Sequence, residues 1–139
     1  MVLMMNDEEF EKIKKDFIVD QNAYDIENVP EQIKRLLNFA KVGTGGKVFI
    51  ESHNLTSDAQ LRVVLIARFL ANKLQEEIKQ EVSIEELSQY THLDKDQVRA
   101  RMSAIVREKF AERKGKGVFV VLPFRIKKFM EELSNIKGK

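Results

Sequence analysis

Basic and amide side chains in the last third of the chain have the types and spacing of a surface that binds a polyanion. They form two groups, one along a segment of helical periodicity that begins at residue 95 and one around a glycine-containing turn near residue 115. Long cations reach phosphate oxygens, and glycine lets a turn approach a nucleic-acid backbone closely. The candidate binding residues are Lys95, Gln97, Arg99, Arg101, Ser103, Arg107, Arg113, Lys114, Lys116 and Gly117.

Side chains that could carry out catalysis or hold a metal do not converge in the sequence. Adjacent carboxylates such as Glu85 and Glu86 diverge by about 100° on a helix and cannot share a substrate atom. The two histidines, His53 and His92, are far apart in the sequence, and neither has a second ligand at metal-site spacing. The lack of cysteine removes thiolate zinc sites and cysteine nucleophiles. We therefore expect no enzyme activity, no metal and no cofactor.

Charge is distributed unevenly along the chain. Residues 1–93 hold 11 Lys and Arg against 16 Asp and Glu, whereas residues 94–139 hold 13 against 6. The first part is therefore acidic and the last part basic. A basic end of this kind is typical of proteins that bind a polyanion.

The sequence predicts neither secretion nor membrane insertion. The apolar start spans five residues and has no basic residues before it, unlike a signal peptide. The apolar-rich stretch 61–74 is interrupted by Arg62 and Arg68, whereas a membrane span needs roughly 20 apolar residues. With the lack of cysteine, these features predict a soluble cytoplasmic protein without a membrane partner.

Two helices are expected near the N-terminus. Asn6 can cap the first, which ends near Asp20 and has one apolar face. A polar loop over residues 20–28 follows, and then Pro30 opens a second helix that runs to Gly43. The apolar residues of the two helices are Phe10, Ile13, Phe17 and Ile18, and Ile33, Leu36, Leu37 and Ala40.

A turn, a short strand and a long helix are expected next. Residues 43–47 predict a turn rather than a phosphate-binding loop, because Val48 stands where that loop needs Ser or Thr. The strand covers residues 48–50. Ser57 and Gln60 have the spacing of a capping box, which predicts a helix over residues 58–79. This helix is apolar around most of its circumference, so we expect it to pack on more than one side.

Two short helices with matching start signals follow. Ser83 with Glu86 forms one capping box, and Asp94 with Gln97 forms the next. Apolar pairs at the positions of a hydrophobic staple flank both caps, namely Val82 with Leu87 and Leu93 with Val98. Because only residues 90–93 separate the helices, they are expected to pack as a helix-turn-helix.

A basic hairpin and a final helix complete the predicted fold. Residues 110–122 predict two strands joined by a glycine-containing turn, a wing with cations at its tip. A helix is expected over residues 124–136. The order of elements predicts a mainly α (α+β) fold, with a helical extension over residues 1–55 and a winged helix-turn-helix domain over residues 56–139.

Residues 86–120 resemble the DNA-binding module of the gluconate-repressor type (GntR-like) of winged helix-turn-helix regulators. Residues 86–88 read Glu-Leu-Ser, residues 93–99 read Leu-Asp-Lys-Asp-Gln-Val-Arg, and residues 113–120 read Arg-Lys-Gly-Lys-Gly-Val-Phe-Val. The resemblance implies that Lys95 and Arg99 contact DNA and that Gly117 is the glycine at the wing tip. Lys109 departs from the pattern, because the family has a glycine there.

These patterns predict a DNA-binding protein, a transcriptional regulator that binds duplex DNA through a recognition helix over 95–109 and a basic wing over 113–117. We expect a homodimer, paired through the long helix 58–79 or the C-terminal helix. The alternative is a winged helix that serves as a protein-interaction module in a larger complex and binds no DNA directly.

Overall fold

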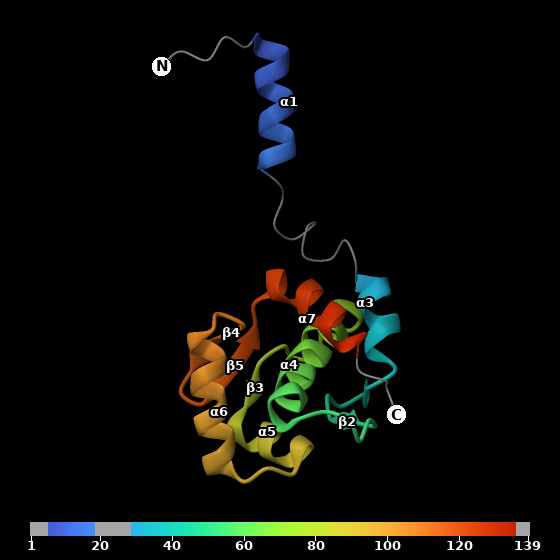
Figure 1. Cartoon of the computed structure of the whole chain (residues 1–139), viewed down its shortest axis with the longest axis vertical. Coiled ribbons are helices and arrows are strands. Elements are labelled where there is room, and N and C mark those ends of the chain that lie inside the picture. Colours follow the sequence, from blue (N-terminus) through green and yellow to red (C-terminus); the bar gives the residue numbers. More distant parts are fainter. Residues whose placement is uncertain (1–5, 19–28, 136–139) are drawn as a thin grey trace.

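The computed structural model describes residues 6–18 and 29–135, which form a mostly helical α+β structure with two small antiparallel sheets (Figure 1). The expected mainly α (α+β) class is confirmed at this level. One hydrophobic core runs from Val29 to Leu133, so it includes residues on both sides of the boundary expected near residue 55. No helix among the described residues is long and apolar enough to cross a membrane.

The first helix, α1 (Asp7–Phe17), has the expected cap, because Asn6 Oδ1 accepts a hydrogen bond from the Glu9 N–H at 2.8 Å. None of its residues is buried. Phe10 and Phe17 are 53% and 84% exposed, so the predicted apolar face is present but uncovered. The loop predicted over residues 20–28 lies outside the described residues.

The second predicted helix is too long. Helix α3 (Val29–Leu36) ends seven residues before Gly43, and Ala40 begins strand β1 (Ala40–Val42) instead of lying on the helix. Strand β1 pairs antiparallel with β2 (Val48–Ile50) across the expected turn, where the Gly46 N–H donates to the Gly43 carbonyl at 2.9 Å. Pairing with β2 across this turn therefore overrides the local helical periodicity.

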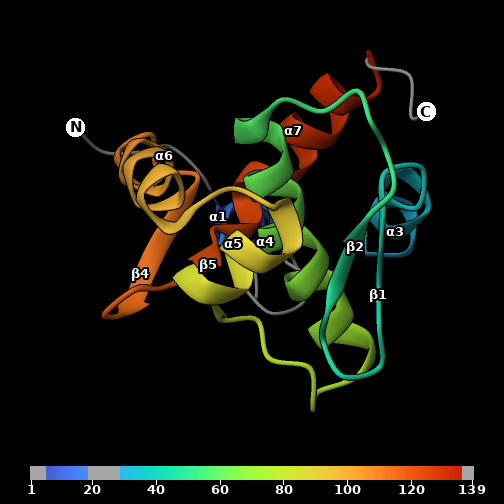
Figure 2. The same ribbon diagram turned by 90° about the horizontal axis from the view of Figure 1, so that it is seen from below.

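Helix α4 (Ser57–Leu74) lies at the centre of the molecule (Figure 2). On one side of it are α6 (Lys95–Arg107) and the hairpin of β4 (Ala111–Gly115) and β5 (Val118–Val121), and on the other is the β1–β2 hairpin. Its residues from Leu61 to Leu70 are almost all buried, which confirms that it packs on several sides. The N-cap is Thr56 and not the predicted Ser57, which is already helical. Thr56 Oγ1 accepts a hydrogen bond from the Ala59 N–H. The helix ends at Leu74 rather than near residue 79.

The next two helices are α5 (Ile84–Thr91) and α6 (Lys95–Arg107), and both predicted capping boxes are confirmed. A strand that the sequence did not predict, β3 (Val82–Ser83), pairs with β5 (Val118–Val121), which also pairs with β4 (Ala111–Gly115). The sheet order is therefore β3-β5-β4. Both strands expected within residues 110–122 are present.

A short 3₁₀ segment, η1 (Pro123–Arg125), leads into the last helix, α7 (Ile126–Leu133). Helix α7 begins two residues later than predicted, and residue 136 lies outside the described residues. Its apolar residues are buried against the rest of the chain, where the Phe129 and Phe110 rings meet edge to face at 5.5 Å. The apolar faces of α4 and α7 are thus both used within one chain.

Candidate functional site

Helix α6 turns a polar face outward because its apolar residues anchor the opposite face. Val98, Met102 and Ile105 are fully buried, whereas Lys95, Arg99 and Ser103, on a neighbouring face of the helix, are exposed. At the N-terminus, Asp94 Oδ1 accepts from the Gln97 N–H at 2.8 Å, and Gln97 Oε1 accepts from the Asp94 N–H. Gln97, a predicted binding residue, is therefore engaged in the cap.

The C-terminus of α6 is closed by a Schellman motif. The Lys109 N–H donates to the Val106 carbonyl at 3.0 Å, and the Phe110 N–H donates to the Ile105 carbonyl at 3.2 Å. Lys109 has a φ of 66°, which is the left-handed conformation that favours glycine. Arg125 donates to the carbonyls of Glu108 and Lys109, which fixes this end of the helix.

A groove of about 550 Å³ lies between α6, the start of α5 and the β4–β5 hairpin. Six of the ten predicted binding residues line it, and Glu85 is its one acidic lining residue. The groove is therefore a site of positive charge between an exposed helix and an exposed hairpin. The six are Lys95, Arg99, Ser103, Arg113, Lys116 and Gly117.

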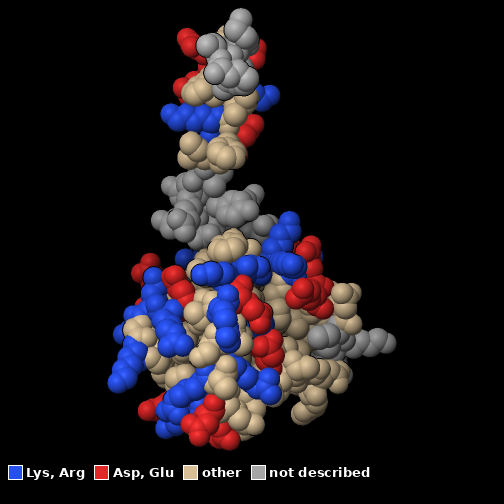
Figure 3. Space-filling view, turned by 60° about the vertical axis from the view of Figure 1, so that its left-hand side comes forward, with Lys and Arg blue, Asp and Glu red and all other residues tan. Residues whose placement is uncertain are grey.

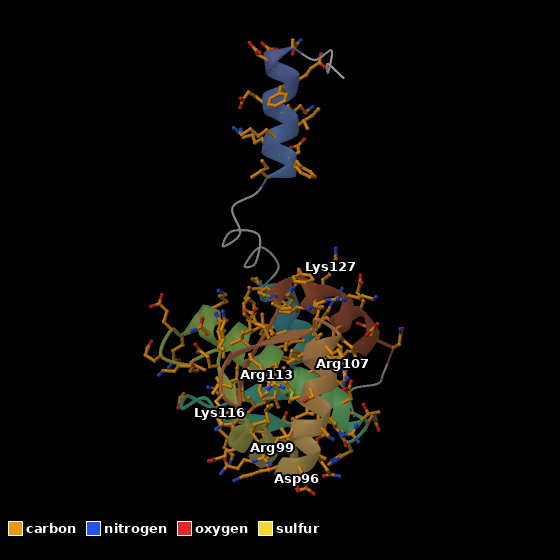
Figure 4. All side chains as sticks on the ribbon, turned by 90° about the vertical axis from the view of Figure 1, so that its left-hand side faces the viewer. Asp96, Arg99, Arg107, Arg113, Lys116 and Lys127 are labelled. Carbon is orange, nitrogen blue, oxygen red and sulfur yellow. The ribbon has the colours of Figure 1, made fainter. Side chains whose placement is uncertain are left out.

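Arg113 connects the hairpin to α6. Its Nη2 lies 3.4 Å from Ser103 Oγ, within hydrogen-bond distance, and its guanidinium carbon lies 5.5 Å from the centre of the Phe119 ring. These contacts hold one cation in a defined position at the centre of the groove. Figure 4 shows Arg99, Arg113 and Lys116 together beside α6.

The hairpin turn is narrow because Gly117 adopts a φ of 70°. Its carbonyl accepts from the Ile84 N–H at 3.0 Å, which ties the turn to the start of α5. A Cβ at this position would lie 3.5 Å from the Ile84 side chain, so space permits one, but the backbone conformation favours glycine.

The other predicted cations are not brought into the groove. Arg101 and Arg107 are exposed on α6, and Figure 4 places Arg107 towards the C-terminal end of the helix. Lys114 forms an ion pair with Glu112 at 3.1 Å. Within the groove, Arg99 pairs with Asp96 at 3.0 Å, in an exposed pair that water and salt weaken.

The face that carries α6 and the hairpin is basic but not uniformly so. Lysine and arginine side chains gather over it, with acidic side chains between them (Figure 3). The large exposed apolar residues of the described chain, such as Phe17, Leu74 and Phe49, belong to other elements. The positive surface is therefore interrupted by carboxylates and not by an apolar patch.

Sequence reasoning missed the part played by Arg68, which is 5% exposed at the middle of the molecule. Its guanidinium donates to the carbonyls of Gly46, Lys79 and Glu81 and to Glu86 Oε2, the last at 2.7 Å. These bonds join the β1–β2 turn, the loop after α4 and the cap of α5. An arginine within the otherwise apolar run of residues 63–70 was the available signal.

Glu86 is at the centre of this network. Burial alone would raise the pKa of its carboxyl, but hydrogen bonds from Arg68, the Ser83 N–H and Tyr90, with the charge of Arg68, outweigh burial and lower that pKa. Glu86 therefore stays ionised while it caps α5. In this way the interior of the molecule positions the helix that precedes α6.

No group of three or more His, Asp or Glu side chains within residues 6–18 and 29–135 is placed to hold a metal ion. Comparison with protein-family models found no match to this chain, and neither did searches of curated proteins and of solved structures.

Proposed function

We propose that this protein binds duplex DNA as a winged helix-turn-helix module, with α6 as the recognition helix and the β4–β5 hairpin as the wing. The observation that carries the proposal is the groove lined by Lys95, Arg99, Arg113 and Lys116, in which Glu85 is the one acidic lining residue. A helix and a hairpin that converge with exposed cations match the way such modules contact a major groove and the flanking backbone.

Phosphate contacts dominate the proposed interaction. The outward face of α6 presents Asp96 and the small Ala100 beside its cations, which gives few groups for direct reading of base edges. Affinity is therefore expected to fall steeply with salt, as counterions compete for the phosphates. Sequence preference should be modest.

The wider role that we propose is that of a cytoplasmic transcriptional regulator that acts as a homodimer on half-sites about one helical turn apart. The apolar residues of α4 and α7 are mostly buried within the chain, although Leu74 at the end of α4 is 72% exposed, whereas α1 buries none of its residues and is therefore the better surface for pairing. Phe10, Ile13 and Phe17 are spaced as in a heptad repeat, and all three are exposed.

A titration of a fluorescent duplex with wild-type protein and with the double variant Lys95→Ala/Lys116→Ala tests the proposal. We expect at least about tenfold weaker binding at low salt, and a salt slope smaller by about two, because two phosphate contacts are lost. The matched control is Lys127→Ala/Lys128→Ala, which removes the same charge from exposed positions on α7.

The control variant should bind as the wild type does. Equal losses in both double variants would mean that net charge alone drives the interaction, and an unchanged groove variant would remove the groove from the interface. Either result contradicts the proposal.

A protein-interaction module is the second candidate, and the uncovered apolar face of α1 favours it. A helix with such a face is a common anchor for the groove of a partner protein. This candidate predicts no binding to duplex DNA even at low salt, so the same titration separates the two functions.

A further inference from the structure

A second polar cavity lies between the C-terminal half of α5 and the β1–β2 hairpin, whereas the α6 groove touches the start of α5. It encloses about 1000 Å³, and α5 and β2 lie side by side there (Figure 2). His53 and His92, which are far apart in the sequence, both line it, together with Lys47. The structure thus brings the only two histidines of the chain to one cavity.

The lining of this cavity has a positive bias. It includes a lysine and two histidines but no aspartate or glutamate, and amides and hydroxyls supply most of the remaining polar groups. Lysine carries a full positive charge at neutral pH, and a histidine adds one when it is protonated. Such a lining attracts anions and gives a cation no ligand of opposite charge.

The three nitrogen-bearing side chains are not held by a hydrogen bond or an ion pair to another described residue. Among the described residues, neither imidazole hydrogen-bonds to another group, and Lys47 forms no ion pair. The Lys47 ammonium lies 5.2 Å from the centre of the Phe49 ring. By contrast, Lys41, also in the hairpin, pairs with Glu51 at 3.7 Å.

The backbone at His92 adds an independent observation. His92 ends α5 with a φ of 63°, a left-handed conformation in which glycine or asparagine is usual. This conformation ends α5 and leaves the exposed His92 side chain at the wall of the cavity.

We propose that this cavity binds a small phosphate ester with an aromatic body, such as a nucleoside monophosphate. Lys47, His53 and His92 hold the phosphate, whose three terminal oxygens accept charge-assisted hydrogen bonds from donors on separate segments. The ring of Phe49, which is 45% exposed and lines the same cavity, contacts the aromatic body. The cavity volume is at the upper end for small-molecule sites.

The test is a calorimetric titration of the full chain with adenosine monophosphate, adenosine and inorganic phosphate, with proton NMR of the two imidazoles in parallel. We expect one molecule of adenosine monophosphate to bind per chain and to shift both imidazole signals. Inorganic phosphate should shift the same signals but bind more weakly, and adenosine should bind weakest.

His92→Gly is the decisive variant, because it removes the imidazole while glycine suits the backbone at this position. We expect it to fold and to bind adenosine monophosphate at least about tenfold more weakly, as does Lys47→Met. Lys41→Met, on a hairpin residue that does not line the cavity, should keep the wild-type affinity.

Three results would overturn the proposal. They are the absence of binding at millimolar ligand, full affinity in His92→Gly, and loss of affinity in Lys95→Ala/Lys116→Ala but not in His92→Gly. The last result would place the phosphate in the α6 groove instead.

Discussion

At the scale of single residues, two positions with a left-handed backbone show that the surroundings of a residue determine what its side chain can do. Lys109 and His92 both end helices with a positive φ, yet their surroundings differ. The main-chain carbonyl of Lys109 accepts from Arg125, and its side chain is exposed on the surface. His92 instead lines a cavity. Both residues therefore have a strained backbone, but only His92 lies at a proposed ligand site.

Lys109→Gly should stabilise the protein. Glycine adopts the left-handed conformation without the Cβ clash, which we expect to raise the free energy of unfolding by about 0.5 to 1 kcal/mol. Chemical denaturation measures this change. Lys109→Ala is the control and should bring no gain, since it keeps the Cβ; a gain of equal size in both variants would refute the conformational explanation.

At the scale of elements, the helix starts that depend on residues close together in the sequence were predicted well. Both capping boxes, at Ser83 and at Asp94, depend on residues three apart, so they are readable from sequence. Strands β1 and β3 were not predicted, because segments of two or three residues become strands only through their pairing partners. The partner of β1 is β2, across the turn at residues 43–47, and the partner of β3 is the distant β5. The same limit applied to Arg68, whose partners lie up to 22 residues away.

The candidate site was predictable only in part, for the same reason. Sequence periodicity identified the exposed cations of α6, but packing decided which of them share a groove with the hairpin. Arg101 and Arg107 were predicted to bind together with Arg99, although the family resemblance pointed only to Lys95 and Arg99, and the structure leaves Arg101 and Arg107 outside the groove. The convergence of His53 and His92 had no sequence signal, because it depends on contact between β2 and α5.

The attachment of α5 to the core should depend on pH. The pKa of Glu86 is lowered in the folded chain, so its contribution to stability is present above the ordinary glutamate range and is lost as pH falls through the lowered pKa. We expect Glu86→Gln to be less stable at neutral pH and to lose less stability between about pH 5 and pH 3. Thermal melting over this range measures the effect.

Glu132→Gln, at an exposed position on α7, is the matched control and should follow the wild-type pH profile. If Glu86→Gln also keeps the wild-type profile, the ionised form of Glu86 is not favoured by folding.

At the scale of the whole molecule, two separate surfaces outside the core are proposed to bind macromolecular partners. The groove side carries α6 and the hairpin, and the uncovered apolar face of α1 is a separate surface. Helix α1 buries no residue in its own chain, so its apolar side chains gain from contact with a second copy. The proposed dimer therefore separates the surface for pairing from the surface for DNA.

Phe10→Ser/Phe17→Ser should shift the protein from dimer to monomer, because it removes the apolar contacts of the proposed pairing face. Sedimentation equilibrium over a range of concentrations measures the mass. Phe124→Ser replaces another exposed phenylalanine, in η1, and should leave the dimer intact. A wild-type chain that is monomeric throughout, or a dimer that survives the α1 change, would contradict pairing through α1.

The most direct test of the central claim is a map of backbone amide chemical shifts while duplex DNA is added to the full chain. We predict chemical-shift changes concentrated in residues 95–103 of α6 and 113–117 of the hairpin. The amide signals of α1 and of the β1–β2 hairpin should not change. Shifts confined to α1, or none at low salt, would contradict DNA binding through the α6 groove.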